Sequence, residues 1–452
     1  MTAADNGALR QVSLASFAGS TIEFYDFFIY GTAAALVFPT VFFPHLDHVQ
    51  GVVASLGTFA SAFISRPIGA LVFGHFGDRI GRKRVLVATL LLMGVSTLGV
   101  GLIPGAATIG PVAALLLTLL RLAQGFAVGG EWAGSALLTA EHAPPGKRGF
   151  YGMFTQLGYG TALILANLVF LVVYSMTPAS STAFLDWAWR IPFLLSAGLI
   201  VTALLVRWRV KETPASSEAP ATAHSEVPIK AMLREQPRQF LLAAGAVIGV
   251  LALVYEVGTF FTHYATAHLG YSTDLVLLVG ALGGLCTAGF VAASATLSDT
   301  YGRRAPITVG YALAVPWSLA VFWLIETRND LLFGAAIVLT YAIIGIVLGP
   351  MTSFIPETFA MRYRYTGAAL AHNIGGILGG GVPPVISEYL LRDYGSWAIG
   401  LMLGGLSMIS LVCVRMLDET APMQASRVRR RPVTAKPEVH REASALLDVE
   451  DA

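Results

Sequence analysis

The chain contains little charge for its size. Only 12% of its 452 residues are Asp, Glu, Lys or Arg, against roughly 25% in an average soluble domain, and the mean hydropathy is +0.68. A transmembrane helix needs about 20 apolar residues, so a set of about twelve helices would use nearly all of the 55% that is hydrophobic. The composition excludes a soluble enzyme with one membrane anchor and predicts an all-α polytopic membrane protein.

Other absences narrow the possible functions. The two cysteines, Cys286 and Cys413, both lie in apolar runs, which argues against a disulfide framework or a cysteine zinc site. The net charge of +2 is too small to suggest nucleic acid as a partner. The sequence has no Walker A motif, no HExxH, no GxSxG and no ring-like filter segment. We therefore do not expect an ATPase, another enzyme or a channel. We also expect no metal site and no cofactor, with the proton as the coupling ion.

Apolar stretches predict twelve transmembrane helices. The first is too long for a signal peptide, and it carries Glu23 and Asp26. The predicted helices lie at about 13–44, 51–76, 83–103, 111–143, 148–176, 188–209, 239–265, 274–297, 305–325, 331–355, 365–390 and 396–417.

Lysine and arginine predict the orientation of these helices. Of the 29 such residues, 24 fall on the side of the two termini, 3 fall on the opposite side and 2 lie inside predicted helices. Basic residues concentrate in cytoplasmic loops. We therefore expect a multi-pass protein of the cytoplasmic (inner) membrane with both termini in the cytoplasm.

The composition also predicts the domain boundaries. Two stretches are polar: a Pro/Ala/Ser-rich linker and a basic tail containing RVRRRP. The tail has no sustained apolar heptads, so we expect a solvated tail, with contact to anionic lipid as the alternative. The predicted parts are a cytoplasmic N-terminus (1–12), a six-helix bundle (13–209), a cytoplasmic linker (210–238), a second six-helix bundle (239–417) and the tail (418–452).

The two predicted bundles share landmarks in the same order. HFGDRIGRKRVL around Asp78 corresponds to TLSDTYGRRAPI around Asp299, and Glu141 corresponds to Glu357. An offset of six helices preserves orientation, so the halves are parallel repeats about an axis along the membrane normal. Such repeats place a substrate site near the midplane between the halves, which favours a transport function.

Several segments resemble a known family. GHFGDRIGRKR resembles the loop 2–3 signature of the major facilitator superfamily. GSTIEFYDFFIYG, SRPIGALVFGHFGDRIGRK, RLAQGFAVGGEWAGSALLTAEHAPPGKRGFYG and PETFAMRYRYTGAALAHNIGGILGG resemble, more narrowly, its metabolite:proton symporter family, with permeases for shikimate, 2-oxoglutarate, citrate and proline or betaine. The resemblance covers all twelve predicted helices. It implies two six-helix bundles and secondary active transport. The proline/betaine branch typically has a coiled-coil C-terminus, which this tail lacks.

The resemblance also implies a latch between the halves. In the first copy it consists of Gly74, Asp78, Arg79, Gly81 and Arg82, and in the second copy of Asp299 and Arg303. The alternative for the basic residues is topology signalling alone.

A second set of charges flanks the predicted helix ends. We expect salt bridges between the halves from Glu141 with Arg148, and from Glu357 with Arg362 or Arg364. The alternative is a set of solvated loop charges, since exposed pairs contribute only about 0–1 kcal/mol.

Five ionisable side chains stand out inside the predicted helices of the first half. Burial in hydrocarbon costs such a group at least roughly 2.5–3.5 kcal/mol, so these groups usually face a cavity and serve a function. Helical spacing places Glu23 and Asp26 on one face with Tyr30, and Arg121 on one face with Gln124 and Glu131. The five are Glu23, Asp26, Arg66, Arg121 and Glu131.

Proton-coupled transport assigns roles to these groups. A buried carboxyl changes its proton occupancy with its surroundings, and a planar guanidinium binds a carboxylate in bidentate fashion. We expect Glu131 and Asp26, and then Glu23, to carry the proton. We expect Arg121 with Gln124 to bind substrate, with Arg66 as the partner of Glu23 or Asp26. Tyr30, Tyr255 and Asn373 are further candidate substrate contacts. The alternative is a structural ion network in which Tyr255 and Asn373 only join helices.

The sequence thus predicts proton-coupled uptake of a small carboxylate by a monomer that cycles by alternating access. Three other transport reactions stay open: symport of a zwitterion such as proline or betaine, symport of an inorganic ion, and drug:proton antiport. A transporter-like nutrient sensor that binds solute without moving it is the alternative from a different class.

Overall fold

The computed structural model describes residues 3–80, 82–129, 131–177, 182–209 and 228–421. Within these ranges only the backbone is described for residues 3–8, 74–75, 77–80, 82–84, 86, 141, 203–209 and 228.

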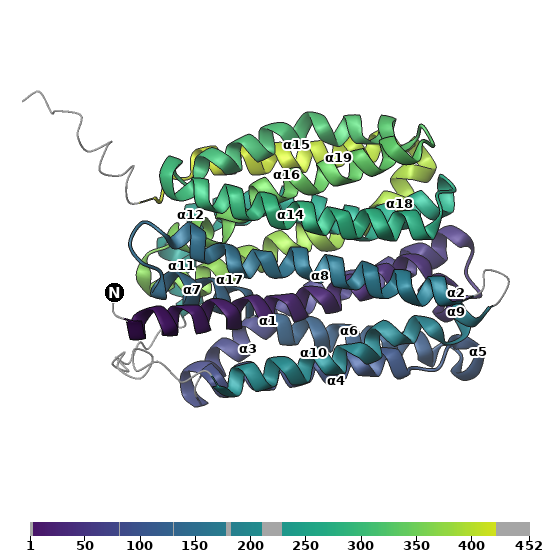
Figure 1. The fold of residues 1–452 in the computed structure, drawn as a ribbon, viewed down its shortest axis with the longest axis horizontal. Helices are drawn as coiled ribbons and strands as arrows, with labels where there is room; N and C mark the ends of the chain where they lie inside the picture. Colours follow the sequence, from purple (N-terminus) through teal and green to yellow (C-terminus); the bar gives the residue numbers. More distant parts are fainter. Residues whose placement is uncertain (1–2, 81, 130, 178–181, 210–227, 422–452) are drawn as a thin grey trace, which may run out of the picture.

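The described residues form an all-helical structure of long, roughly aligned helices (Figure 1). Nine helices in this part of the chain are long and apolar enough to cross a membrane, and two shorter apolar helices accompany them. The longer helices before the linker are α1 (Ala3–Leu36), α3 (His48–Ile80), α4 (Arg82–Leu102), α6 (Val112–Val128), α7 (Glu131–His142), α8 (Arg148–Met176) and α10 (Ile191–Arg209). The longer helices after the linker are α12 (Pro237–Tyr255), α14 (Thr273–Tyr301), α15 (Arg304–Ile325), α16 (Asp330–Glu357), α17 (Arg364–Gly376), α18 (Val382–Tyr394) and α19 (Ser396–Met416).

Short helices complete the described path. They are α2 (Phe38–Phe42), α5 (Ala106–Ile109), α9 (Ala183–Asp186), η1 (Ala188–Arg190), α11 (Pro228–Glu235), α13 (Phe261–His263) and η5 (Met361–Tyr363). Three further segments are π-helical turns: η3 (Glu256–Phe260), η4 (Tyr264–His268) and η6 (Ile377–Gly381).

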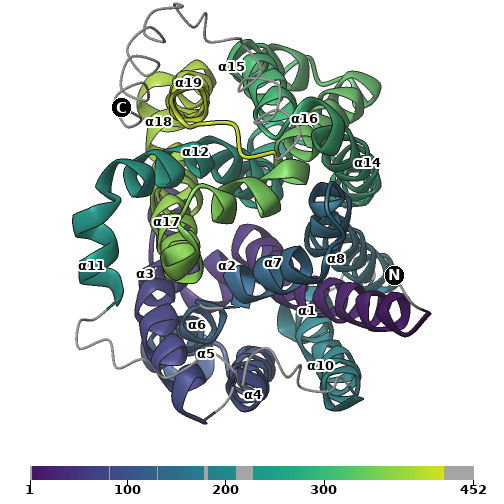
Figure 2. The ribbon, with the colours of Figure 1, turned by 90° about the vertical axis from the view of Figure 1, so that its left-hand side faces the viewer.

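The helices separate into two halves that lie side by side (Figure 2). The first half contains α1 to α10 and the second contains α12 to α19. Across the boundary α8 packs on α14 and α16, α3 packs on α17 and α18, and α1 packs on η3 and α13. The interface between the halves therefore runs along helices that carry most of the predicted site residues.

Small residues set the closest approach between helices of the first half. A Cβ at Gly125 of α6 would overlap the carbonyl oxygen of Ala62 on α3, and one at Gly69 would overlap the carbonyl of Phe126. Glycines let two backbones touch where any larger side chain would hold them apart. This contact holds Arg121, one turn before Gly125, near the ring of Phe59 on α3.

The structure differs from the predicted helices in two ways. Two of the predicted helices contain π-helical turns, which widen the hydrogen-bond spacing and often mark functional sites. Part of the predicted linker forms α11, which buries Met232 against α12 and α17. The rest of the linker (210–227) and the tail beyond Ala421 lie outside the described residues.

We name the two ends of the molecule by their side chains. The basic end is where α1 and α8 begin and α14 ends, and it holds Arg148 and Arg303. The opposite end is where α1 ends and α3 begins, and it holds His48 and His263. In Figure 1 the basic end is at the left, marked by the N-terminus, and α2 and α9 lie at the right.

Candidate functional site

Arg121 lies at the centre of the first half with its side chain fully buried. Its guanidinium carbon sits 4.1 Å from the ring centre of Phe27, 4.0 Å from that of Tyr30 and 5.0 Å from that of Phe59. Nη1 donates to Oε1 of Gln124 at 3.1 Å. Nε and Nη2 have no hydrogen-bond partner among the described residues. A buried donor without a partner costs about 1–3 kcal/mol, so these two N–H groups form an open fork for an anion.

A chain of hydrogen bonds connects this guanidinium to Asp26. Gln124 Nε2 donates to Oγ1 of Thr97 at 2.8 Å. Thr97 Oγ1 lies 2.7 Å from Oδ2 of Asp26 and 2.9 Å from the carbonyl oxygen of Met93, and the link to Asp26 forms when its one hydrogen is donated to the carboxylate. The chain joins α6, α4 and α1. Asp26 is 1% exposed, and its Oδ1 has no hydrogen-bond partner in the described part of the chain. A change of charge on Asp26 is therefore transmitted to Arg121 through fixed polar groups.

The buried acids lie near this chain. Asp26 is within electrostatic reach of both Arg121 and Glu131, and Glu23 is within reach of Tyr255. Glu23 and Glu131 are 3% and 5% exposed. Three carboxyl groups, two from α1 and one from the start of α7, thus share one buried region with a guanidinium.

Arg66 extends the polar region to the second half. Its guanidinium carbon lies 4.1 Å from the ring centre of Phe27 and 4.7 Å from that of Phe63. It shares a hydrogen bond with the side chain of Tyr255, whose ring packs on Phe63 with the centroids 4.9 Å apart. Arg66 Nε has no hydrogen-bond partner among the residues whose side chains are described. Tyr255 is therefore the second-half residue that contacts the cationic part of the site.

The remaining predicted contacts are less central. Tyr30 lies under Arg121 and donates its hydroxyl to Oγ1 of Thr58 at 2.8 Å. Asn373 donates to the carbonyl of Gly129 at 2.8 Å, and His372 stacks on Trp132 with ring centres 3.9 Å apart. These last contacts join α17 to the end of α6 and the start of α7. Asn373 thus holds the two halves together in this conformation instead of lining the fork of Arg121.

Asp299 makes the principal contact between halves at the basic end. Its carboxylate accepts from the backbone N–H groups of Gly149 at 2.8 Å and Phe150 at 2.9 Å, at the start of α8. Arg303 Nη1 donates to the same carboxylate at 2.7 Å. A carboxylate is stabilised at a helix N-terminus by the free N–H groups and by the helix dipole. The second half therefore supplies the anionic cap for a helix of the first half.

Glu357 pairs differently from the sequence expectation. Its carboxylate lies 3.8 Å from Nη1 of Arg148 and 3.4 Å from Nε of Arg303. Arg362 pairs with Glu235 of α11 instead, and Nε of Arg364 has no hydrogen-bond partner in the described region. Glu357 therefore pairs with Arg303 of its own half and with Arg148 of the other half, instead of with Arg362 or Arg364. The approach of Arg148 depends on the packing of the two halves and cannot be read from the sequence.

The first copy of the predicted latch cannot be compared with the second. Gly81 lies outside the described residues, and so do the side chains of Asp78, Arg79, Arg82 and Glu141, as well as the surroundings of Gly74. Their predicted roles stay predictions.

The sequence reasoning missed the side chains that shape the site. Phe27, Phe59 and Phe63 enclose the two guanidinium groups, and Thr97 joins Gln124 to Asp26. The aromatic signal was present in the sequence, because Phe59 and Phe63 are spaced to share one face of a helix. Thr97 carried no such signal, because a lone hydroxyl in an apolar helix usually bonds its own backbone.

Comparison with known proteins agrees with this arrangement. Residues 17–380 match the sequence profile of the Major Facilitator Superfamily. The chain belongs to the major facilitator superfamily. It is therefore a multi-pass membrane transporter and not an enzyme.

Its relatives in the superfamily transport metabolites. The chain is 40% identical over 418 residues to the inner membrane metabolite transport protein YhjE of Escherichia coli, covering 91% of this chain and 94% of that protein. It is 36% identical over 416 residues to the shikimate transporter of the same organism, covering 89% and 94%. It is 33% identical over 406 residues to the E. coli proline/betaine transporter, covering 87% and 80%. The chain is thus a metabolite transporter of this superfamily.

A solved structure shares the same fold. The D-xylose-proton symporter superimposes with a TM-score of 0.73 at 18% identity, over 91% of this chain and 98% of that one. The all-helical major facilitator fold predicted from the sequence is confirmed.

Proposed function

We propose that this transporter takes up a small organic acid together with protons. The observation that carries the proposal is the open fork of Arg121, whose Nε and Nη2 are buried without hydrogen-bond partners among the described residues. Two parallel N–H groups of one guanidinium match the two oxygens of a carboxylate. The relatives include a shikimate transporter, and shikimate is a small carboxylic acid, which supports the same substrate class.

Substrate binding would be coupled to protonation through the polar chain. A carboxylate bound to Arg121 brings a negative charge next to Asp26 and Glu131, and like charges at short range oppose one another. A proton on one of these acids removes the repulsion, so proton and substrate bind better together than singly. The chain from Arg121 through Gln124 and Thr97 to Asp26 supplies the physical link. Glu23 is the third candidate carrier because it shares the buried region.

Alternating access would use the two halves as moving units. We propose residues 13–209 and 239–417 as these units, joined by the linker 210–238. The contacts of Asp299 with α8 and of Glu357 with Arg148 then act as the latch of the basic end. The excess of Lys and Arg supports a cytoplasmic location for that end and for both termini, in a protein of the inner membrane.

The substrate role of Arg121 is tested in proteoliposomes. We expect Arg121→Lys to keep the charge but lose the planar fork, so the KM for labelled shikimate or another small carboxylate rises roughly 10–100-fold, as expected for a lost charge-assisted hydrogen bond. Arg392→Lys is the matched control, because Arg392 is exposed and forms its ion pair with its neighbour Asp393. An unchanged KM in Arg121→Lys would contradict the substrate role.

The coupling role of Glu131 is tested by separating exchange from accumulation. Glu131→Gln keeps the shape of the side chain but removes the exchangeable proton. We expect the variant to lose accumulation driven by a pH gradient while it retains counterflow of substrate, because counterflow needs no net proton movement. If Glu131→Gln retains pH-driven accumulation, Glu131 does not couple transport to protons, and Asp26 or Glu23 takes that role. Asp26→Asn and Glu23→Gln are then tested by the same two measurements, pH-driven accumulation and counterflow.

The proline/betaine relatives support symport of a zwitterion as the second candidate. A zwitterion also carries a carboxylate for Arg121, and its cationic group would need an acid such as Glu131 nearby. The two candidates separate in one competition assay, in which unlabelled betaine either displaces the labelled carboxylate or leaves its uptake unchanged.

A further inference from the structure

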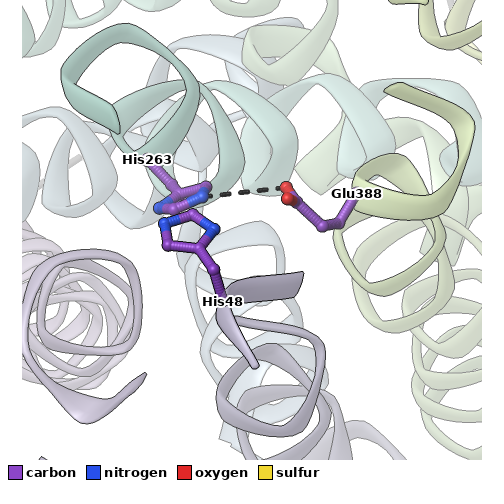
Figure 3. A group of neighbouring side chains, drawn as sticks. All are labelled: His48, His263 and Glu388. Atoms are coloured by element: carbon purple, nitrogen blue, oxygen red, sulfur yellow. Dashed lines mark ion pairs between the residues drawn. The ribbon is translucent and has the colours of Figure 1, made fainter. Parts of the chain in front are cut away.

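A second polar cluster lies far from Arg121, at the opposite end of the molecule. Glu388 of α18 faces two histidines of the second half: its carboxylate lies 3.7 Å from Nε2 of His263 and 3.4 Å from Nε2 of His268. His48, in the first turn of α3, comes from the first half, and its ring centre lies 5.6 Å from that of His263 and 6.1 Å from that of His268. Figure 3 shows His48 and Glu388 converging on His263 from separate helices.

Two buried atoms of this cluster face each other without hydrogen-bond partners. His263 is 3% exposed and Glu388 is 1% exposed, and among the described residues neither Nε2 of His263 nor Oε2 of Glu388 has a hydrogen-bond partner. The other ring nitrogen of His263, Nδ1, lies 3.3 Å from the carbonyl oxygen of Ala35. A carbonyl oxygen can only accept, so Nδ1 carries the hydrogen. In the neutral ring Nε2 then presents a lone pair toward a carboxylate oxygen, and two acceptors face one another.

A cation between the two acceptors resolves this arrangement. The 3.7 Å separation is too long for a hydrogen bond, but it is close to the spacing of two ligands of one metal ion. Zinc binds imidazole nitrogen and carboxylate oxygen at about 2.0–2.2 Å, which places tetrahedral ligands about 3.4 Å apart. The Glu388 separations are 3.4 Å to His268, which equals that spacing, and 3.7 Å to His263, which is slightly longer. A ring nitrogen held by a backbone carbonyl is also the usual outer contact of a metal-ligating histidine.

The third and fourth ligands complete the set. Ligand atoms of His48, His263 and Glu388 all lie within 4.8 Å of one another, so His48 needs only a small rotation to reach a shared ion. Its side chain is exposed and stands at a helix start, where such a rotation meets little resistance. His268 is 34% exposed, and together with His48 it gives an ion access from solvent. Three imidazoles and one carboxylate form a donor set that suits zinc and similar transition metals.

We propose that His48, His263, His268 and Glu388 form a binding site for a divalent transition metal of the zinc type, which joins the two halves at the opposite end. His48 belongs to α3, whereas the other three ligands belong to the second half. A bound ion therefore holds this end closed. The binding itself does not depend on the proposed substrate or coupling roles.

The sequence predicted no metal site, and the reason is the spacing of the ligands. His48 and Glu388 lie 340 positions apart in the sequence, and none of the four residues forms a compact motif of the kind that sequence patterns detect. The packing of α3 against α18 brings His48 close to Glu388.

Thermal unfolding of the purified full chain, with any affinity tag removed, tests the site. We expect ZnCl2 at about a hundredfold excess over its dissociation constant to raise Tm by at least about 3 °C, and MgCl2 to have no effect. His48→Ala, His268→Ala and Glu388→Gln should lose most of this shift. His45→Ala is the matched control, because His45 is exposed in the same loop and outside the cluster, and it should keep the full shift.

Two outcomes overturn the proposal. An unchanged Tm of the wild-type chain with ZnCl2 leaves the cluster as ion pairs without a metal. A full shift retained in His48→Ala excludes a bridge between the halves. Because His48 and His268 are not fully buried, their variants keep the test valid if Glu388→Gln fails to fold. Direct measurement of bound zinc should give about one ion per wild-type chain, and a clearly lower ratio in His48→Ala.

Discussion

At the scale of single residues, Thr97 holds a position that no other side chain of the polar chain can fill. Its hydroxyl accepts from Gln124 and donates to Asp26, so it connects the guanidinium of Arg121 to a carboxylate on another helix. A methyl group in its place would leave a buried amide N–H and a buried carboxylate oxygen without their partners. Because valine has nearly the same shape as threonine, the substitution removes hydrogen bonds and leaves the packing of the helices nearly unchanged.

We expect Thr97→Val to lower the free energy of unfolding by about 1–3 kcal/mol and to reduce pH-driven uptake. Thr118→Val is the matched control: Thr118 is also in a transmembrane helix, but its hydroxyl bonds only the carbonyl of Ala114 in its own helix. Thermal unfolding and proteoliposome uptake measure both effects. Equal Tm values and equal uptake for the two variants would show that the link through Thr97 is dispensable.

The sequence predicted the charged members of this site better than their surroundings. Asp26 and Arg121 were predicted as site residues because ionisable groups are rare inside membrane helices. Helical spacing then placed Tyr30 on the same face as Asp26, and Gln124 on the same face as Arg121. The phenylalanines around the guanidinium groups looked like ordinary apolar residues in an apolar chain. Which acid faces which arginine depends on how the helices rotate about their axes, and a single sequence does not encode that rotation in a readable form.

At the scale of helices, the capping of α8 by Asp299 is the contact that ties the halves at the basic end. The carboxylate accepts from two backbone N–H groups of one half and from Arg303 of the other. Its bonds are charge-assisted, worth about 1.5–3 kcal/mol each. They break whenever the two helix ends separate, so they stabilise the closed basic end relative to the open one.

We expect Asp299→Asn to favour opening of the basic end. Ser353→Cys is a suitable reporter, because Ser353 is buried at the boundary and donates to the carbonyl of Arg148. Its labelling by a maleimide should become roughly tenfold faster in Asp299→Asn, as expected for the loss of about 1.4 kcal/mol. Asp274→Asn is the matched control, since Asp274 is exposed at the other end of the same helix. Unchanged labelling would contradict the latch.

Apolar runs predicted the positions of the long helices, because about 20 apolar residues in sequence have few alternatives to crossing a membrane. They did not predict the three π-helical turns. A π-helical turn in a long helix leaves the apolar pattern almost unchanged, so composition alone does not reveal it. Nor did they predict helix α11, which follows the Pro/Ala/Ser-rich part of the linker.

At the scale of the whole molecule, the two halves touch at both ends in the described structure. Asp299 and Glu357 join them at the basic end, and His263 contacts the carbonyl of Ala35 at the opposite end. A cavity lined by Asn167, Gly258 and Tyr341 measures about 20 Å³, which is room for about one water. This cavity is therefore too small for a metabolite in the described conformation.

We expect the opposite end to face the outside of the cell. In a background with Cys286 and Cys413 replaced by alanine, Asp274→Cys marks the opposite end and Ala360→Cys marks the basic end, and both positions are exposed. A membrane-impermeant maleimide should label Asp274→Cys in intact cells, and should label Ala360→Cys only after permeabilisation, because positive loops stay in the cytoplasm. The reverse pattern would invert the predicted topology.

The repeat of landmarks between Asp78 and Asp299 predicted the parallel arrangement of two halves. The contacts between the halves were less predictable, because they depend on how helices that are distant in the sequence pack against one another. The pairing of Glu357 with Arg148 is an example: both residues were predicted as salt-bridge members, but with partners in their own halves.

The π-helical turn η3 limits which deletions this part of the chain can tolerate in evolution. It stands between Tyr255, which bonds Arg66, and His263, which faces Glu388. A π turn holds one residue more than an α turn, and each residue of a helix adds a rotation of about 100°. Deleting that extra residue would rotate either Tyr255 or His263 away from its present neighbours. A homologue that lacks the residue could therefore keep the contact of Tyr255 with Arg66 or the contact of His263 with Glu388, but not both, unless other residues changed with it.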